Sequence, residues 1–207
     1  DIASISGGDN TANDTITALI ALDAHVTLRS VRGSRVVPLS EFYVGVRKTV
    51  MQPDEMLIDI AIPALKPNQH GIYLKLGLRR AQAISVVNCA VMIEQATTGL
   101  IAADDGDTNA TPAITDIRIA LGAVAPTIIR AKDAERSLVG NPLSEFTIAR
   151  AAHLAQATAT PISDVRSSAT SKVIGFMLFL EIVKLTTWYH SRLDPVKPMG
   201  GKLVEEI

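Results

Sequence analysis

The sequence predicts an α+β protein in which a first unit, built from strands and one packed helix, precedes a second unit of strands and helices. Apolar residues recur every three positions at Ile16, Leu19 and Leu22, as they do on one face of a helix. Apolar strand patterns flank polar turns over residues 24–31 and 56–62. With 207 residues, 47% of them hydrophobic, the chain is long enough to bury a substantial core.

Composition excludes several classes of protein. A net charge of −1, with lysine and arginine scattered along the chain, predicts no nucleic-acid surface. The single cysteine, Cys89, cannot form an internal disulfide and suits a reducing compartment, so we expect a cytoplasmic protein. The longest apolar run, residues 173–180, is far short of the roughly 20 residues that span a bilayer, and no membrane span is predicted.

Two adjacent glycines, Gly7 and Gly8, directly precede the polar start of the first predicted helix. Glycine lacks a Cβ atom, so a ligand can approach the backbone N–H groups closely. Free N–H groups and the helix dipole favour an anion such as a phosphate at this point. An ordinary glycine turn into a capped helix explains the same residues, and the turn alone does not decide between the two.

The rest of the first unit is predicted to be mostly strand. Residues 24–31 and 35–37 form a hairpin across the Gly33-Ser34 turn, and Ser40 is expected to cap a short turn through residues 41–43. The strand 56–62 ends at Pro63. Proline and glycine between polar residues then predict a linker, marked by Pro63, Pro67 and Gly71.

The second unit is predicted to begin with strands and to end with helices. Strands are expected over residues 86–94 and 113–122, joined by the polar hairpin connection 103–111. Helices are expected just after residue 130, over residues 143–158, and from residue 161 onwards. Cys89 falls in an apolar strand and is expected in the core.

Many short segments of the chain resemble, in the same order, the FAD-binding medium subunit of the molybdenum hydroxylases, the family of xanthine dehydrogenase and aerobic carbon monoxide dehydrogenase. In the first unit these segments are residues 4–14, 17–24, 37–42, 45–49 and 52–57; in the second they are 119–127, 130–135 and 161–169. The resemblance implies the C-terminal part of a type-2 (PCMH-like) FAD-binding domain over 1–66. It also implies a flavoprotein C-terminal domain, a small antiparallel sheet with helices, over 67–172. Residues 173–207 resemble the family least and are expected to form a divergent helix and a tail.

Six positions match the cofactor contacts of the family: Gly7, Gly8, Asn10, Asp14, Lys75 and Ile84. The resemblance implies that the glycines and Asn10 hold the FAD pyrophosphate and that Asp14 hydrogen-bonds the sugar or diphosphate region. It further implies that Lys75 touches the cofactor and that Ile84 covers the isoalloxazine ring. For Lys75 a solvated strand edge is the alternative interpretation.

The chain departs from the family pattern in three places. Asp9 puts a carboxylate beside the expected diphosphate, so whether Asp9 or Asn10 faces the cofactor stays open. Ala83 stands where the family often has aspartate. Nothing in this chain matches the earlier glycine-rich loop of the family, so we expect a companion chain, or a segment outside this one, to supply that half of the flavin site.

The resemblance implies an electron-transfer role. In the family, a large molybdenum-cofactor subunit oxidises the substrate, and [2Fe–2S] clusters on a small subunit pass electrons to FAD. The flavin then reduces NAD+, a quinone or O2. FAD is thus the cofactor expected on this chain, and no metal site is predicted because its four histidines are far apart in sequence. The alternative is a truncated or degenerate scaffold subunit that does not bind FAD alone.

Overall fold

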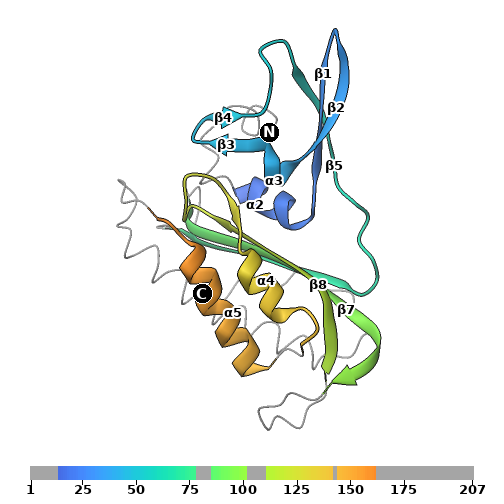
Figure 1. Cartoon of the computed structure of the whole chain (residues 1–207), viewed down its shortest axis with the longest axis vertical. Helices are drawn as coiled ribbons and strands as arrows, with labels where there is room; N and C mark the ends of the chain where they lie inside the picture. The colour runs from blue at the N-terminus through green and yellow to red at the C-terminus, as the bar shows by residue number, and fades with distance from the viewer. Residues whose placement is uncertain (1–13, 78–84, 102–110, 142–143, 162–207) are drawn as a thin grey trace.

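The computed structural model describes residues 14–77, 85–101, 111–141 and 144–161. Figure 1 shows two units: a small, mostly β unit made by the N-terminal part of the chain, and below it a long, bent antiparallel sheet with helices on the face turned away from the first unit. Helix α2 (Asp14–Ala21) lies between the two units. The α+β architecture predicted from the sequence is confirmed.

Helix α2 buries the face that its apolar spacing predicts. Ile16, Leu19 and Ile20 are at most 8% exposed and form the centre of the core of the first unit. The helix ends where Asp23 takes a positive φ of 58° and the chain turns into the first strand. The same apolar face also packs on the sheet of the second unit, so that one core joins both units.

The predicted hairpin is confirmed. Strand β1 (His25–Ser30) pairs antiparallel with β2 (Gly33–Pro38), and β5 (Met56–Ala61) pairs with the other edge of β1, which gives the order β2-β1-β5. Side chains alternate between the two faces of this sheet, and Val26 and Leu28 of the central strand point into the core with no exposed surface.

A short helix follows β2, and its start corrects the predicted cap. Helix α3 (Leu39–Phe42) contains Ser40 instead of beginning after it, and no side chain of the described residues caps it. The helix starts earlier because Leu39 and Phe42 are both fully buried and the Leu39 N–H donates to the Ala24 carbonyl at 2.8 Å. Strands β3 (Tyr43–Gly45) and β4 (Lys48–Thr49) then form a small separate sheet.

The second unit is an antiparallel sheet of four strands in the order β6-β7-β8-β9. Its strands are β6 (Gln69–Gly77), β7 (Ser85–Ile101), β8 (Thr111–Gly122) and β9 (Ile129–Arg130). The strands predicted over 86–94 and 113–122 are confirmed, and β7 continues to Ile101 because β8 pairs with it that far. The predicted connection 103–111 lies almost wholly outside the described residues.

The prediction that Gly71 belongs to a linker was wrong, because this residue lies inside β6. An added Cβ atom there would stand 2.2 Å from the sulfur of Met92, the residue opposite it on β7. The Met92 side chain thus lies close against the Gly71 backbone within the β6–β7 pairing, and Gly71 is a strand residue.

The two faces of the four-stranded sheet carry different helices. Ala90, Met92 and Ala120 pack against α2, whereas Val87 and Cys89 belong to a second core on the opposite face. That opposite face is covered by α4 (Lys132–Leu138) and α5 (Glu145–Thr158), as Figure 1 shows. Cys89 is a core residue as predicted, and burial raises the pKa of its thiol.

The helices predicted after residue 130 and over 143–158 are confirmed. Ser144 begins α5 with a capping box, in which its hydroxyl accepts from the Thr147 N–H and the Thr147 hydroxyl accepts from the Ser144 N–H. The helix predicted from residue 161 and the segment 173–207 lie outside the described residues. Among the described helices, none has the length and apolar character to cross a membrane.

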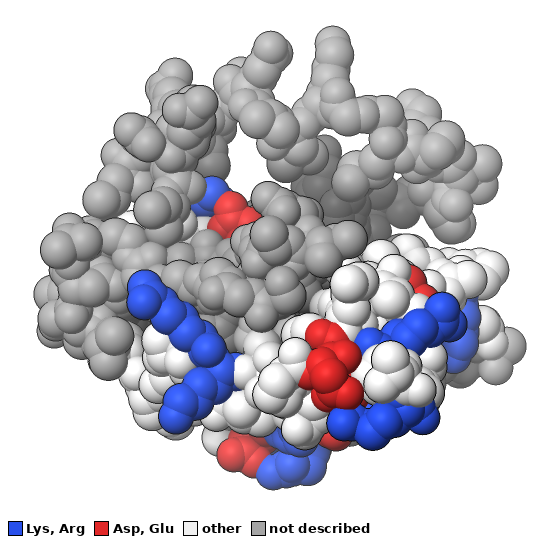
Figure 2. All heavy atoms as spheres, turned by 90° about the horizontal axis from the view of Figure 1, so that it is seen from above, with Lys and Arg blue, Asp and Glu red and all other residues white. Residues whose placement is uncertain are grey.

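Charged side chains of opposite sign lie beside one another on the described surface seen from above in Figure 2. Arg35 on β2 and Glu55 form a bidentate ion pair. Arg35 Nε and Nη2 donate to the two Glu55 oxygens at 2.7 and 2.9 Å, and the Gln52 N–H donates to the same carboxylate at 2.7 Å. These hydrogen bonds, the one from Arg35 first, lower the pKa of Glu55 from its ordinary value of 4.5 to about 2.

We expect Glu55→Gln to remove part of the acid sensitivity of the fold. Because the pKa of Glu55 is depressed in the folded state, its stabilisation is complete above about pH 4.5 and is lost as the pH falls towards about 2. Thermal melts across this range should show a steeper loss of melting temperature in the wild type than in Glu55→Gln. Asp54→Asn, which alters the neighbouring exposed pair with Arg32, is the control and should follow the wild type. If the melting temperature fell equally steeply with pH in all three proteins, the prediction would be contradicted.

Candidate functional site

The candidate site begins where α2 meets the four-stranded sheet. Asp14 is the first residue of α2, so its carboxylate stands in the first helical turn, where the helix dipole favours negative charge. The sheet beneath carries small residues on the α2 side, among them Ala90, Ala120 and Gly122. The helix can therefore lie close to the strands, and Asp14 reaches side chains of both β6 and β7.

The structure brings Asp14 and Lys75 together. These residues are 61 positions apart in sequence, yet Lys75 Nζ lies 2.5 Å from Asp14 Oδ2. The Lys75 side chain is 29% exposed and that of Asp14 is 35% exposed, so the pair is half-buried and still open to solvent on one side. Lys75 sits on an edge strand, as the alternative interpretation required, but its ammonium group is held against α2 and is not simply solvated.

Two buried side chains of β7 also contact Asp14. The Ser85 hydroxyl donates to Asp14 Oδ1, and Asn88 Nδ2 lies 3.4 Å from the same oxygen. Ser85 is 1% exposed and Asn88 is fully buried. One carboxylate oxygen is thus held by the sheet interior and the other by Lys75 at its rim.

Tyr73 stands next to Lys75 on the same face of β6, because side chains two positions apart on a strand point the same way. Burial raises the pKa of its phenol, and the nearby Asp14 carboxylate raises it further. The phenol is therefore protonated at neutral pH and can donate a hydrogen bond. We name Asp14, Tyr73, Lys75, Ser85 and Asn88 the Asp14 cluster.

Asn88, the most deeply buried member of the Asp14 cluster, packs against the backbone of Gly122 on β8. Asn88 pairs across the sheet with Gly122 on β8, and an added Cβ atom on Gly122 would stand 2.2 Å from Asn88 Oδ1 and 2.5 Å from Thr17 Oγ1. Thr17 is fully buried on α2. Only glycine at position 122 leaves room for both side chains, so helix α2 and strands β7 and β8 meet at this point.

Of the six predicted contacts, Asp14 and Lys75 lie in the described structure and are brought together. Gly7, Gly8, Asn10 and Ile84 lie outside the described residues, and so do Asp9 and Ala83. Sequence reasoning missed Tyr73, Ser85 and Asn88. For Asn88 a signal was present, because it is the single polar residue in the apolar run 86–93, and a buried polar residue needs a reason.

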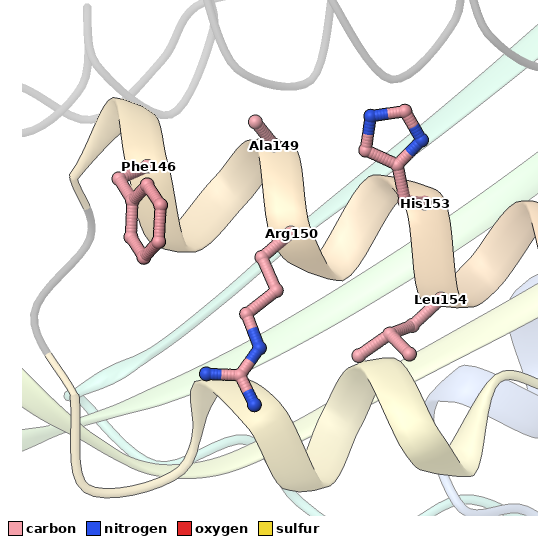
Figure 3. Close-up of a pocket in the computed structure, with 5 residues that line it drawn as sticks. All are labelled: Phe146, Ala149, Arg150, His153 and Leu154. Atoms are coloured by element: carbon pink, nitrogen blue, oxygen red, sulfur yellow. The ribbon is translucent and has the colours of Figure 1, made fainter.

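A hollow on the described surface lies away from the Asp14 cluster. It is an open, apolar depression along α5, and Figure 3 shows its lining side chains: Phe146, Ala149, Arg150, His153 and Leu154. Helix α5 covers the sheet face opposite the one that carries Asn88 and Lys75. None of the predicted cofactor contacts in the described residues lines it, so we do not assign the site there.

Chemically, the Asp14 cluster combines a carboxylate with fixed oxygens, a lysine ammonium group and a phenol near a helix N-terminus. A carboxylate accepts hydrogen bonds from ligand hydroxyl groups, and an ammonium group attracts phosphate. The cluster therefore suits a ligand that is both hydroxylated and anionic.

Two family models match successive parts of the chain. A model of the FAD binding domain in molybdopterin dehydrogenase matches residues 3–65. A model of the CO dehydrogenase flavoprotein C-terminal domain matches residues 72–173. Asp14 belongs to the first match, and the other members of the Asp14 cluster belong to the second.

Curated medium chains and solved structures of related enzymes also match this chain. The chain is 30% identical over 170 residues to the carbon monoxide dehydrogenase medium chain of Hydrogenophaga pseudoflava, covering 80% of this chain and 54% of that relative. It is 31% identical to the nicotine 6-hydroxylase medium subunit of Paenarthrobacter nicotinovorans, covering 80% of this chain and 52% of the relative. Its fold matches a chain of the carbon monoxide dehydrogenase structure from Hydrogenophaga pseudoflava with a TM-score of 0.75 and 27% identity, covering 88% of this chain and 58% of that one. The chain thus spans about half the length of these relatives.

Proposed function

Because this chain belongs to the family of FAD-binding medium subunits of the molybdenum hydroxylases, we propose that it binds FAD through the Asp14 cluster and serves in electron transfer. The observation that carries the proposal is the half-buried Asp14–Lys75 pair, which joins the two matched domains at a helix N-terminus. The predicted division of the chain at residues 66 and 67 remains part of the proposal.

The residues of the cluster fit the polar part of FAD. In this proposal the Asp14 carboxylate accepts hydrogen bonds from hydroxyl groups of the ribityl or ribose region, and Lys75 lies near the negative diphosphate. Gly7, Gly8 and Asn10 complete the diphosphate site through backbone N–H groups and an amide, and Ile84 covers the ring. The partial exposure of both side chains leaves them accessible to such a ligand.

FAD, when bound, supplies the ability to accept electrons singly and release them in pairs. The chain itself contributes binding and orientation. We propose that its partners are a large molybdenum-cofactor subunit and a small [2Fe–2S] subunit, that the acceptor is NAD+, a quinone or O2, and that the complex works in the cytoplasm. The match of residues 3–65 to a model of a FAD binding domain supports this proposal over the alternative of a scaffold without FAD.

The test is FAD retention by the intact protein that contains this chain. Visible absorption after gel filtration should show flavin bands that stay with the protein. Lys75→Gln should weaken FAD binding about tenfold, measured by the quenching of flavin fluorescence, because one charge-assisted contact is lost. Lys66→Gln is the matched control, because Lys66 pairs with Glu94 at the opposite end of the β6–β7 pairing and should leave the affinity unchanged. Absence of flavin from the wild type, or equal affinity in Lys75→Gln, would overturn the proposal.

A further inference from the structure

We infer that Asn88 is a positioning residue that fixes the Asp14 carboxylate in the orientation needed for FAD, an inference that rests on the proposed function. Asn88 is fully buried in the centre of the sheet, opposite Lys75 on β6 and Gly122 on β8. Its amide Nδ2 faces Asp14 Oδ1 at 3.4 Å. The amide therefore links the interior of the second unit to the first turn of α2.

The other end of the same amide lacks a hydrogen-bond partner in the part of the chain that the structure describes. Asn88 Oδ1 is buried and finds no partner within the described residues. A buried acceptor without a partner lowers stability, and such groups in folded proteins call for an explanation. Turning the amide over would place Oδ1 against the negative Asp14 oxygen and remove the donor from it, so the carboxylate accounts for the observed orientation.

Packing also fixes the amide more firmly than the other donors to Asp14. A Cβ atom on Gly122 would stand 2.2 Å from Asn88 Oδ1 and 2.9 Å from Asn88 Cγ, so the backbone of β8 lies directly against this group. The Ser85 hydroxyl can rotate about its Cβ–Oγ bond, and Lys75 has a long flexible side chain. Asn88 is thus the rigid member of the Asp14 cluster, and we assign to it the fixed position of the carboxylate.

This assignment makes FAD binding by the first matched domain depend on the sheet of the second. Asp14 lies on α2 of the first domain, whereas its rigid contact comes from β7 of the second. A change at Asn88 should therefore reduce FAD affinity through Asp14, without any contact between Asn88 and FAD.

The experiment is a titration of FAD into the intact protein carrying Asn88→Ala, together with a melting curve of the protein before FAD is added. We expect FAD to bind about tenfold more weakly, since one hydrogen bond to a charged group is lost. Val87→Ala is the matched control: it truncates the neighbouring buried side chain on the opposite face of β7. It should lower the melting temperature at least as much as Asn88→Ala while FAD affinity stays within about twofold of the wild type.

A double-mutant cycle with Asp14→Ala tests whether Asn88 affects FAD affinity through Asp14 or through a wider change in the fold. If Asn88 acts through Asp14, adding Asn88→Ala to Asp14→Ala should cause no further loss of affinity. Losses that multiply, or an Asn88→Ala protein that binds FAD as the wild type does, would overturn the inference. Should Asn88→Ala not fold, Asn88→Ser serves instead, because its shorter side chain cannot reach Asp14 and the same tenfold loss is expected. A wild type that binds no FAD would overturn the proposed function and this inference with it, whereas wild-type binding with unaffected Asn88 variants would overturn the inference alone.

Discussion

Asp14→Ala is expected to weaken FAD binding about a hundredfold in the intact protein, because it removes the acceptor at the centre of the Asp14 cluster. Lys75, Ser85 and Asn88 all donate to this carboxylate or lie within hydrogen-bond reach of it. Two of these donors are buried and would be left without their acceptor, so we also expect a loss of about 1–3 kcal/mol in the free energy of unfolding. Fluorescence titration and urea denaturation measure the two effects.

The matched control for this variant is Asp133→Ala on α4. Asp133 pairs with Arg136, but both side chains are well exposed, at 61% and 72%. Exposed pairs of this kind contribute little, so FAD affinity should not change and stability should change by about 0.5 kcal/mol or less. Asp14→Asn keeps the size of the side chain and should lose part of the affinity. Equal FAD affinity in Asp14→Ala and Asp133→Ala would show that the Asp14 cluster is not the site.

Gly122→Ala is expected to destabilise the fold by about 2–3 kcal/mol, a large effect for one added methyl group. The new Cβ atom would stand 2.2 Å from Asn88 Oδ1 and 2.5 Å from Thr17 Oγ1, and both of these residues are fully buried. The backbone has little freedom to move away, because the next residue, Ala123, already has a positive φ of 63°. Urea denaturation should show a lower midpoint with an unchanged slope.

Gly45→Ala is the control for the glycine effect. An added Cβ atom at Gly45 would find its nearest neighbour, Lys48 Cδ, at 3.8 Å, an ordinary van der Waals contact. Its stability should change by about 0.5 kcal/mol or less. Combining Gly122→Ala with Asn88→Ala should cost less than the sum of the two single changes, because the truncated side chain relieves part of the clash. Additive costs would contradict the packing described for this point.

Local sequence pattern predicted the elements whose contacts are local. The apolar spacing of α2 and the alternation of β1 and β2 depend on neighbours a few residues away, and both predictions are confirmed. The predictions for Ser40 and Gly71 were wrong because distant residues decide them. Burial of Leu39 moves the start of α3, and pairing with β7 places Gly71 inside β6.

By itself, the sequence determined the fold class, the family and two members of the Asp14 cluster, Asp14 and Lys75. These follow from the order of residues along the chain and need no knowledge of which residues meet in space. The tertiary structure alone decided that Asp14 meets Lys75 across 61 positions, because helix α2 lies on the sheet face where Lys75 stands. It also revealed the contacts of Ser85, Asn88 and Gly122, and the register sets Asn88 opposite both Lys75 and Gly122. Strand register depends on pairing between distant segments, and a one-residue shift would turn Asn88 to the other face.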